Sequence, residues 1–120
     1  MADSFTAITA DGITMNSAFE DIVTLDKLIH EPARLAIMTA LSSCQSADFL
    51  FLQRLTGLTK GNLSSHLAKL EEAALVQIDK QFIGKRPNTQ VGLTEKGHQA
   101  IDRHWNLLEN LRQNAQSWRA

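Results

Sequence analysis

The chain has 120 residues, of which 43% are hydrophobic, and a formal net charge of −1. This length allows one ordinary domain with a single apolar core, and no apolar run is long enough to span a membrane. The near-neutral charge alone does not suggest a nucleic-acid partner, while the single cysteine, Cys44, excludes an internal disulfide and favours the cytoplasm.

Residues 1–17 are predicted to form a flexible arm, because they show no sustained period and are rich in Thr, Ser, Asp and Ala. They lack a basic start followed by an apolar stretch, so we expect no secretory signal. The predicted domain covers residues 18–116 and leaves residues 117–120 as a tail. Its first segment, residues 18–30, has too many apolar residues for a free helix: Phe19, Ile22, Val23, Leu25, Leu28 and Ile29.

A helix is predicted from Pro32 to Ser42, because proline suits the first turn of a helix, where its missing N–H leaves nothing unsatisfied. Its apolar residues at helical spacing are expected to be buried: Leu35, Met38 and Leu41. Cys44 follows in a loop. We expect a small buried hydrophobe there rather than a redox sensor, since the sequence offers the thiol no obvious cationic activator.

A second short helix is predicted for residues 46–56, with three apolar side chains turned inward: Phe49, Leu52 and Leu55. Gly57 and Leu58 break it just before Thr59, a hydroxyl residue that can cap the next helix. A helix, a tight glycine-containing turn and another helix form the helix-turn-helix pattern. In that pattern the first helix braces the second across the DNA backbone.

The helix after Thr59 carries the most informative surface of the chain. Three leucines recur at helical spacing as one apolar stripe: Leu63, Leu67 and Leu70. The other side has no acid until Glu71, and four of its residues are mostly short and polar: Gly61, Asn62, Ser65 and Lys69. Such a face can approach a polyanion without repulsion and can reach base edges or phosphates. The plain alternative is the amphipathic surface helix of any globular protein.

A β-hairpin is predicted after this helix. Residues 75–83 alternate in polarity, with three apolar residues on one half-buried face: Val76, Ile78 and Phe82. Residues 84–88 supply the glycine, proline and asparagine of a turn, and residues 89–93 form the second strand. Lys85 and Arg86 would stand at the tip, able to hold phosphates or probe the minor groove, unless they are ordinary solvated loop charges.

The last helix is predicted to run from Thr94, its N-cap, to about Gln116. His104 borders its apolar stripe of Ile101, Trp105, Leu108 and Leu111. At roughly 33 Å, this helix is longer than a small domain covers by itself. We therefore predict a homodimer through the terminal helices rather than packing onto one domain; its interface residues would be Phe19, Ile22, Leu25, Trp105, Leu108 and Leu111. Two-fold pairing would set the two DNA-reading helices about 34 Å apart.

The charges are unevenly distributed along the chain. Residues 1–31 hold six acids against one base, whereas residues 54–96 hold seven bases against four acids. A protein with one DNA-facing side should show this asymmetry. The modest positive excess predicts salt-dependent binding of moderate strength per protomer, so a dimer is needed for useful affinity.

Three motifs follow one another in this region: LTKGNLSSHL at residues 58–67, GKRPNT at residues 84–89 and LTEKG at residues 93–97. In this order and spacing they resemble the winged-helix regulators of the MarR/ArsR-like group, over roughly two thirds of the chain. The resemblance implies a mainly α winged helix-turn-helix fold with a small β-hairpin, or wing, and pairing through terminal helices. Relatives usually have glycine where this chain has Ala74, and a left-handed alanine would be strained by roughly 1 kcal/mol.

We therefore predict a transcriptional regulator, a repressor, that binds double-stranded DNA sequence-specifically as a homodimer. The recognition helix, residues 60–73, would lie in the major groove, and the wing, residues 76–93, on the backbone or in the minor groove. The predicted DNA contacts are Thr59, Lys60, Gly61, Asn62, Ser64, Ser65, Lys69, Lys85, Arg86 and Thr89. The sequence names no operator, and it leaves open an unidentified small-molecule effector bound between the dimer helices and the DNA-binding part.

Three other functions fit the sequence less well. Metal sensing needs a full ligand set, and Asp102 with His104 supplies only two ligands, so we expect no metal or cofactor. Catalysis is not expected, because the neighbours Ser64, Ser65 and His66 diverge by about 100° on a helix, and His66 fits a hydrogen-bonded position at the edge of the core. A winged-helix module that binds protein without reading DNA stays open as the alternative.

Overall fold

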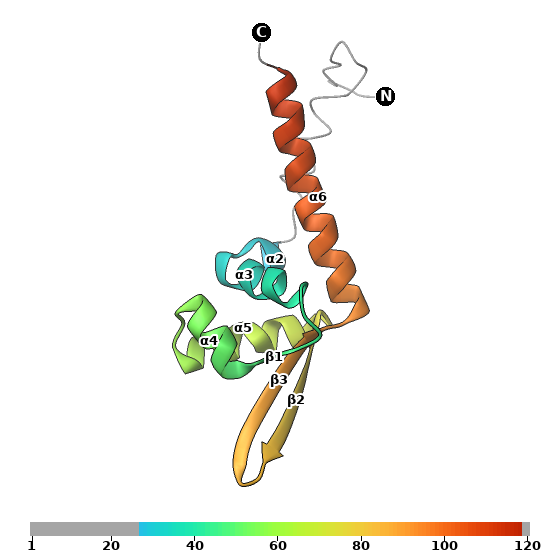
Figure 1. Ribbon diagram of the computed structural model, residues 1–120. Helices are drawn as coiled ribbons and strands as arrows, with labels where there is room; N and C mark the ends of the chain where they lie inside the picture. Colours follow the sequence, from blue (N-terminus) through green and yellow to red (C-terminus); the bar gives the residue numbers. More distant parts are fainter. Residues whose placement is uncertain (1–26, 119–120) are drawn as a thin grey trace. The chain divides into compact units, whose positions relative to one another are not determined.

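The computed structural model describes residues 27–118, which Figure 1 shows as coloured ribbon. The chain divides into two compact units, residues 27–102 and a second unit that includes residues 103–118. The elements are α2 (Lys27–His30), α3 (Pro32–Leu41), β1 (Ala47–Asp48), α4 (Phe49–Thr56), α5 (Lys60–Glu72), β2 (Val76–Ile83), β3 (Arg86–Leu93) and α6 (Glu95–Ser117). None of these helices combines the length and the hydropathy that a membrane crossing requires. The predicted arm, and the predicted interface residues Phe19, Ile22 and Leu25, lie outside the described residues.

The helix predicted from residue 32 is α3. Its N-cap is Glu31, whose carboxylate accepts a hydrogen bond from the Arg34 backbone N–H at 2.8 Å. Two of the three predicted core residues are buried: Met38 and Leu41. Leu35 is only half-buried, and Ile37, which the prediction omitted, is fully buried instead. Cys44 is exposed, so the expectation of a buried thiol was wrong.

The second predicted helix is shorter than expected. Ala47 and Asp48 form strand β1, and α4 begins at Phe49 because the Asp48 carboxylate caps it, accepting a hydrogen bond from the Phe51 N–H at 2.7 Å. Leu52 is fully buried, as predicted. The prediction that Leu55 points inward was wrong, because Leu55 is 49% exposed. Leu52 is the residue of this short helix that is buried.

The three strands form an antiparallel sheet in the order β1-β3-β2. β2 and β3 pair along their whole lengths, whereas β1 pairs only with Gln90 and Val91 of β3. Gly84 joins the long strands in a tight turn, with a φ of 65° that glycine adopts without strain. In Figure 1 this hairpin extends well away from α3, α4 and α5.

Two hairpin predictions need correction. The turn is much shorter than residues 84–88, because strand β3 already begins at Arg86. Pro87 fits inside this strand because β1 does not reach it, so β3 is an edge strand at that position. Phe82 is 74% exposed, since the buried part of β2 ends near Ile78.

The core of residues 27–102 draws side chains from every long element of the unit. The three leucines predicted for the inner stripe of α5 are all buried: Leu63, Leu67 and Leu70. They join fully buried residues from the other helices and the sheet: Ile37, Met38, Leu41, Leu52, Val91 and Ile101. Helix α5 is therefore held by one face and leaves the opposite face to solvent.

The end of α5 is a Schellman motif with an alanine in the left-handed position. The helix stops at Glu72, one residue earlier than predicted. The Ala74 N–H donates to the Glu71 carbonyl at 2.9 Å, and the Leu75 N–H donates to the Leu70 carbonyl at 2.9 Å. Ala74 has a φ of 62°, so the strain anticipated from the sequence is present and the fold tolerates it.

Replacing Ala74 with glycine is expected to stabilise the protein by about 1 kcal/mol, because glycine adopts positive φ without a Cβ clash. The melting temperature should rise by about 4 °C, measured by circular dichroism. Ala73→Gly is the matched control. Ala73 has a φ of −81°, so glycine there should destabilise by about 0.5–1 kcal/mol. Equal effects of the two substitutions would contradict the assignment of strain to Ala74.

The first turn of α6 is bonded to the end of α5 at three consecutive carbonyls. Lys96 Nζ donates to the Ala73 carbonyl at 3.0 Å, and Thr94 Oγ1 donates to the Ala74 carbonyl at 2.6 Å. The Thr94 backbone N–H donates to the Leu75 carbonyl at 3.1 Å. The prediction that Thr94 is the N-cap of α6 is confirmed, because its Oγ1 accepts a hydrogen bond from the Gly97 N–H at 2.9 Å. These bonds require a close approach, and a Cβ at Gly97 would collide with the Leu75 carbonyl oxygen.

Residues 103–118 continue α6 in the second unit. His104, which borders the predicted apolar stripe, is 3% exposed, whereas Trp105 of the stripe is 44% exposed. Leu108 and Leu111 are half-buried. On the outer side, Glu109 and Arg112 form an ion pair at 2.9 Å, and the hydrogen bond from that guanidinium lowers the pKa of the Glu109 carboxyl.

Candidate nucleic-acid interface

Helices α4 and α5 are joined by a turn whose ends are both capped. Gly57 closes α4 with a φ of 70°, and its N–H donates to the Gln53 carbonyl at 2.9 Å. Thr59 opens α5, since its Oγ1 accepts a hydrogen bond from the Asn62 N–H at 3.1 Å. The cap predicted from the sequence is therefore confirmed. Together the two caps fix a helix-turn-helix in which α5 begins at the surface.

The exposed surface of α5 divides into two strips. Asn62, Ser65 and Lys69 are spaced three or four residues apart and are all exposed; we call this strip the outer face. Lys60 and Ser64 lie on the second strip, which faces a hollow described below. Gly61 stands between the strips, and a Cβ at this position would have no atom within 4 Å. The predicted contact residues of α5 are thus all accessible.

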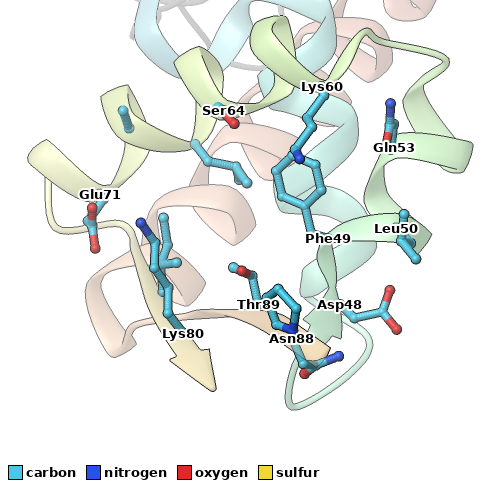
Figure 2. A pocket seen from close by; sticks show the side chains of 14 residues that line it. Asp48, Phe49, Leu50, Gln53, Lys60, Ser64, Glu71, Lys80, Asn88 and Thr89 are labelled. Carbon is cyan, nitrogen blue, oxygen red and sulfur yellow. The ribbon is translucent and has the colours of Figure 1, made fainter. Parts of the chain in front are cut away.

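A hollow of about 820 Å³ lies between α4, α5 and the wing. Figure 2 shows Lys60 and Ser64 projecting from α5, with Lys80 and Thr89 on the wing opposite. Of these residues, Thr89 was predicted to begin the second strand; that strand begins earlier, at Arg86, and Thr89 pairs with Lys80 in the middle of the hairpin. Helix α4, helix α5 and the wing therefore form three walls of one hollow.

The hollow has an uneven charge. Its two lysines, Lys60 and Lys80, come from opposite walls, and Ser64 and Thr89 add hydroxyl groups. Two acids also line the hollow: Asp48 at the start of α4 and Glu71 in the last turn of α5. An anion beside the first turns of α5 meets the Lys60 ammonium and the Ser64 hydroxyl, whereas one near the last turn meets the Glu71 carboxylate.

Five polar residues that line the hollow were not among the predicted site residues: Asp48, Gln53, Glu71, Lys80 and Asn88. Lys80 interrupts the apolar alternation of β2, a signal that a wall residue was present. Gln53 of α4 also lines the hollow, and nothing in its own segment indicated this. The predicted tip residues Lys85 and Arg86 are exposed beyond the hollow, at the turn of the hairpin.

The side of α5 away from the wing is fixed by a buried arginine. Arg34 is 8% exposed, and its Nε donates to the Leu28 carbonyl at 2.6 Å. Its Nη1 lies 3.0 Å from Nδ1 of His66, so the prediction of a hydrogen-bonded histidine at the core edge is confirmed. Glu31 lies 3.8 Å from the same nitrogen. Although desolvation opposes ionisation, the Arg34 N–H and the neighbouring His66 and Arg34 side chains lower the pKa of Glu31.

Within residues 27–118, no group of three or more His, Cys, Asp or Glu side chains is arranged to hold a metal ion. Asp102 and His104 remain the two potential ligands noted in the sequence, Asp102 exposed and His104 buried. The exposed surface of α5 and the wing carries hydroxyl groups, amide groups and cations, together with three acids: Glu71, Glu72 and Asp79.

Comparison with known proteins gives concordant matches. Residues 33–112 match the family described as the winged helix DNA-binding domain. The protein MJ0432 of Methanocaldococcus jannaschii is 35% identical over 75 residues, which is 62% of this chain and 82% of that protein. A transcriptional regulator homologue from Pyrococcus horikoshii OT3 is 31% identical with a TM-score of 0.75, covering 82% of this chain and 97% of that one. A MarR-family regulator from Enterococcus faecalis V583 shares the fold at 21% identity and a TM-score of 0.65, covering 97% and 96% of the two chains.

Proposed function

Because the chain belongs to the winged-helix DNA-binding domain family, we propose that it is a sequence-specific transcriptional repressor that binds operator DNA as a homodimer. Its relatives in that family are regulators of transcription rather than enzymes. Such a regulator acts where the DNA is, and we therefore assign it to the cytoplasm. An effector that tunes its affinity remains part of the proposal, with no residue assigned to it.

The observation that carries the proposal is the site between α5 and the wing. Over its first two turns α5 exposes no acid, and Lys60 faces the same hollow as Lys80 of the wing. With α5 in the major groove, the outer face would meet base edges. The bordering phosphates would then lie along the hollow, which Lys60 lines from α5 and Lys80 lines from the wing. An acid-free strip beside a cationic wing tip suits a polyanion such as duplex DNA.

Base reading by the outer face can be tested with Asn62→Ala. Asparagine pairs with adenine through two hydrogen bonds, so its loss should change the preferred base at one position of each half-site by roughly 1–3 kcal/mol. Selection of bound duplexes from a random pool, before and after substitution, measures this change. Glu72→Ala is the control, because Glu72 is exposed at the far end of α5. An unchanged preference in the Asn62 variant would contradict base reading there.

The dimer rests on α6, which runs for 23 residues and leaves Trp105 44% exposed. Exposed tryptophans are frequent anchors of interfaces. Trp105→Ala is expected to raise the dimer dissociation constant about tenfold or more, measured by sedimentation equilibrium. Arg112→Ala removes an exposed side chain of the same helix and should leave it unchanged. A wild-type chain that stays monomeric at micromolar concentration would contradict the homodimer.

A further inference from the structure

The inner face of the wing carries an aromatic residue beyond the point where the core ends. This face consists of Val76, Ile78, Lys80 and Phe82 of β2 with their partners Leu93, Val91, Thr89 and Pro87 of β3. Ile78 and Val91 belong to the core region, and the Lys80–Thr89 pair lines the hollow. The Phe82–Pro87 pair comes next toward the tip, and Phe82 is 74% exposed.

The surroundings of Phe82 are cationic. Residues 80–89, KQFIGKRPNT, contain three bases and no acid. All three bases are exposed: Lys80, Lys85 and Arg86. An exposed aromatic ring among cations fits a partner that is a polyanion with apolar surface between its charges. The minor groove of duplex DNA has this character, because sugars and base edges lie between two rows of phosphates.

The geometry of the hollow directs Phe82 toward that groove. When α5 occupies the major groove, the sugar-phosphate ridge in the hollow separates it from the neighbouring minor groove. Phe82 lies two residues beyond Lys80, which is about 7 Å further along the strand. The minor groove is about 6 Å wide, too narrow for a two-stranded hairpin with its side chains but wide enough for one ring.

We infer that Phe82 enters the minor groove beside each half-site and wedges partly between two base pairs. Side chains of this kind unstack a base step and bend the duplex toward the major groove. Binding would therefore bend the operator and favour a flexible pyrimidine–purine step at that position, although no hydrogen bond reads it. This inference rests on the proposed function and adds a specificity residue to it.

The test compares three variants of the full chain with the wild type, on a duplex selected from random DNA by the wild-type protein. Phe82→Ala removes the ring, and Phe82→Leu keeps an apolar wedge. Ile83→Ala is the matched control, because Ile83 is 64% exposed on the same strand but faces the other side of the hairpin, opposite Arg86. End-to-end energy transfer measures the bend, and 2-aminopurine placed at successive flanking steps reports local unstacking through its fluorescence.

The wild type, Phe82→Leu and Ile83→Ala should bend the duplex and brighten one 2-aminopurine position in each flank. Phe82→Ala should lose both signals and bind about tenfold more weakly. Equal bending and fluorescence in Phe82→Ala would overturn the inference. So would a loss of binding to phosphatidylserine vesicles in Phe82→Ala with DNA bending unchanged, because the ring would then serve a lipid surface. A wild type that selects no duplex would instead overturn the proposed function itself.

Discussion

Replacing both Lys85 and Arg86 with alanine is expected to weaken binding to every duplex and to reduce the slope of log affinity against log salt by about two. Both side chains are exposed at the turn of the wing, beyond the hollow. Cations in such a position contact phosphates and release bound counterions, so they contribute affinity without sequence preference. Fluorescence anisotropy between 50 and 200 mM salt measures the slope, and the wild type should lose about tenfold more affinity than the variant over that range.

A control must remove the same charge from elsewhere. Lys27 and Arg103 are both exposed and lie outside α4, α5 and the wing. The double variant Lys27→Ala, Arg103→Ala has the same net charge as the wing variant, and its salt slope should remain that of the wild type. If the two double variants lost affinity equally, overall charge rather than the wing tip would account for binding.

Gly97→Ala is expected to destabilise the protein by about 3 kcal/mol or more, a large fraction of the stability of a small domain. The added methyl group would meet the Leu75 carbonyl oxygen, which is backbone and cannot rotate away. Moving α6 outward would break the hydrogen bond from the Thr94 N–H to that carbonyl. Urea unfolding followed by circular dichroism measures the loss.

Gly61→Ala is the matched control for Gly97→Ala. Both glycines are helical, but a Cβ at Gly61 meets nothing within 4 Å. Alanine there should stabilise the protein by about 0.5–1 kcal/mol, as expected for an exposed helical position. A loss of stability at Gly61 similar to that at Gly97 would show that the close approach to Leu75 is not the cause.

The elements that the sequence predicted well are those whose signals are local. The leucine stripe of α5 repeats every three or four residues, and the Thr59 and Thr94 caps act within three residues of themselves. The left-handed residue at the end of α5 could be anticipated because a motif position usually filled by glycine holds Ala74.

The features that escaped prediction depend on distant partners. Strand β1 is only two residues long, and Ala47 is recognisable as a strand residue only through its pairing with Val91. Pro87 was assigned to the turn because proline is excluded from the centre of a sheet. The sequence does not show that β1 ends before it reaches Pro87, which leaves this residue at an edge. Lys60 of α5 and Lys80 of β2 line the same hollow, and this follows from the packing of the two elements rather than from either segment alone.

The three carbonyls at the end of α5 accept hydrogen bonds from the first turn of α6, and these bonds make the connection rigid. A hinge would need a flexible connector. Here each carbonyl has its own donor: the Lys96 ammonium bonds to Ala73, and the Thr94 hydroxyl and backbone N–H bond to Ala74 and Leu75. In the proposed dimer, a change in the angle between the long helices would therefore be passed on to the recognition helices. The distance between the two half-sites that one protein can span would be set as much by that angle as by the residues that touch the bases.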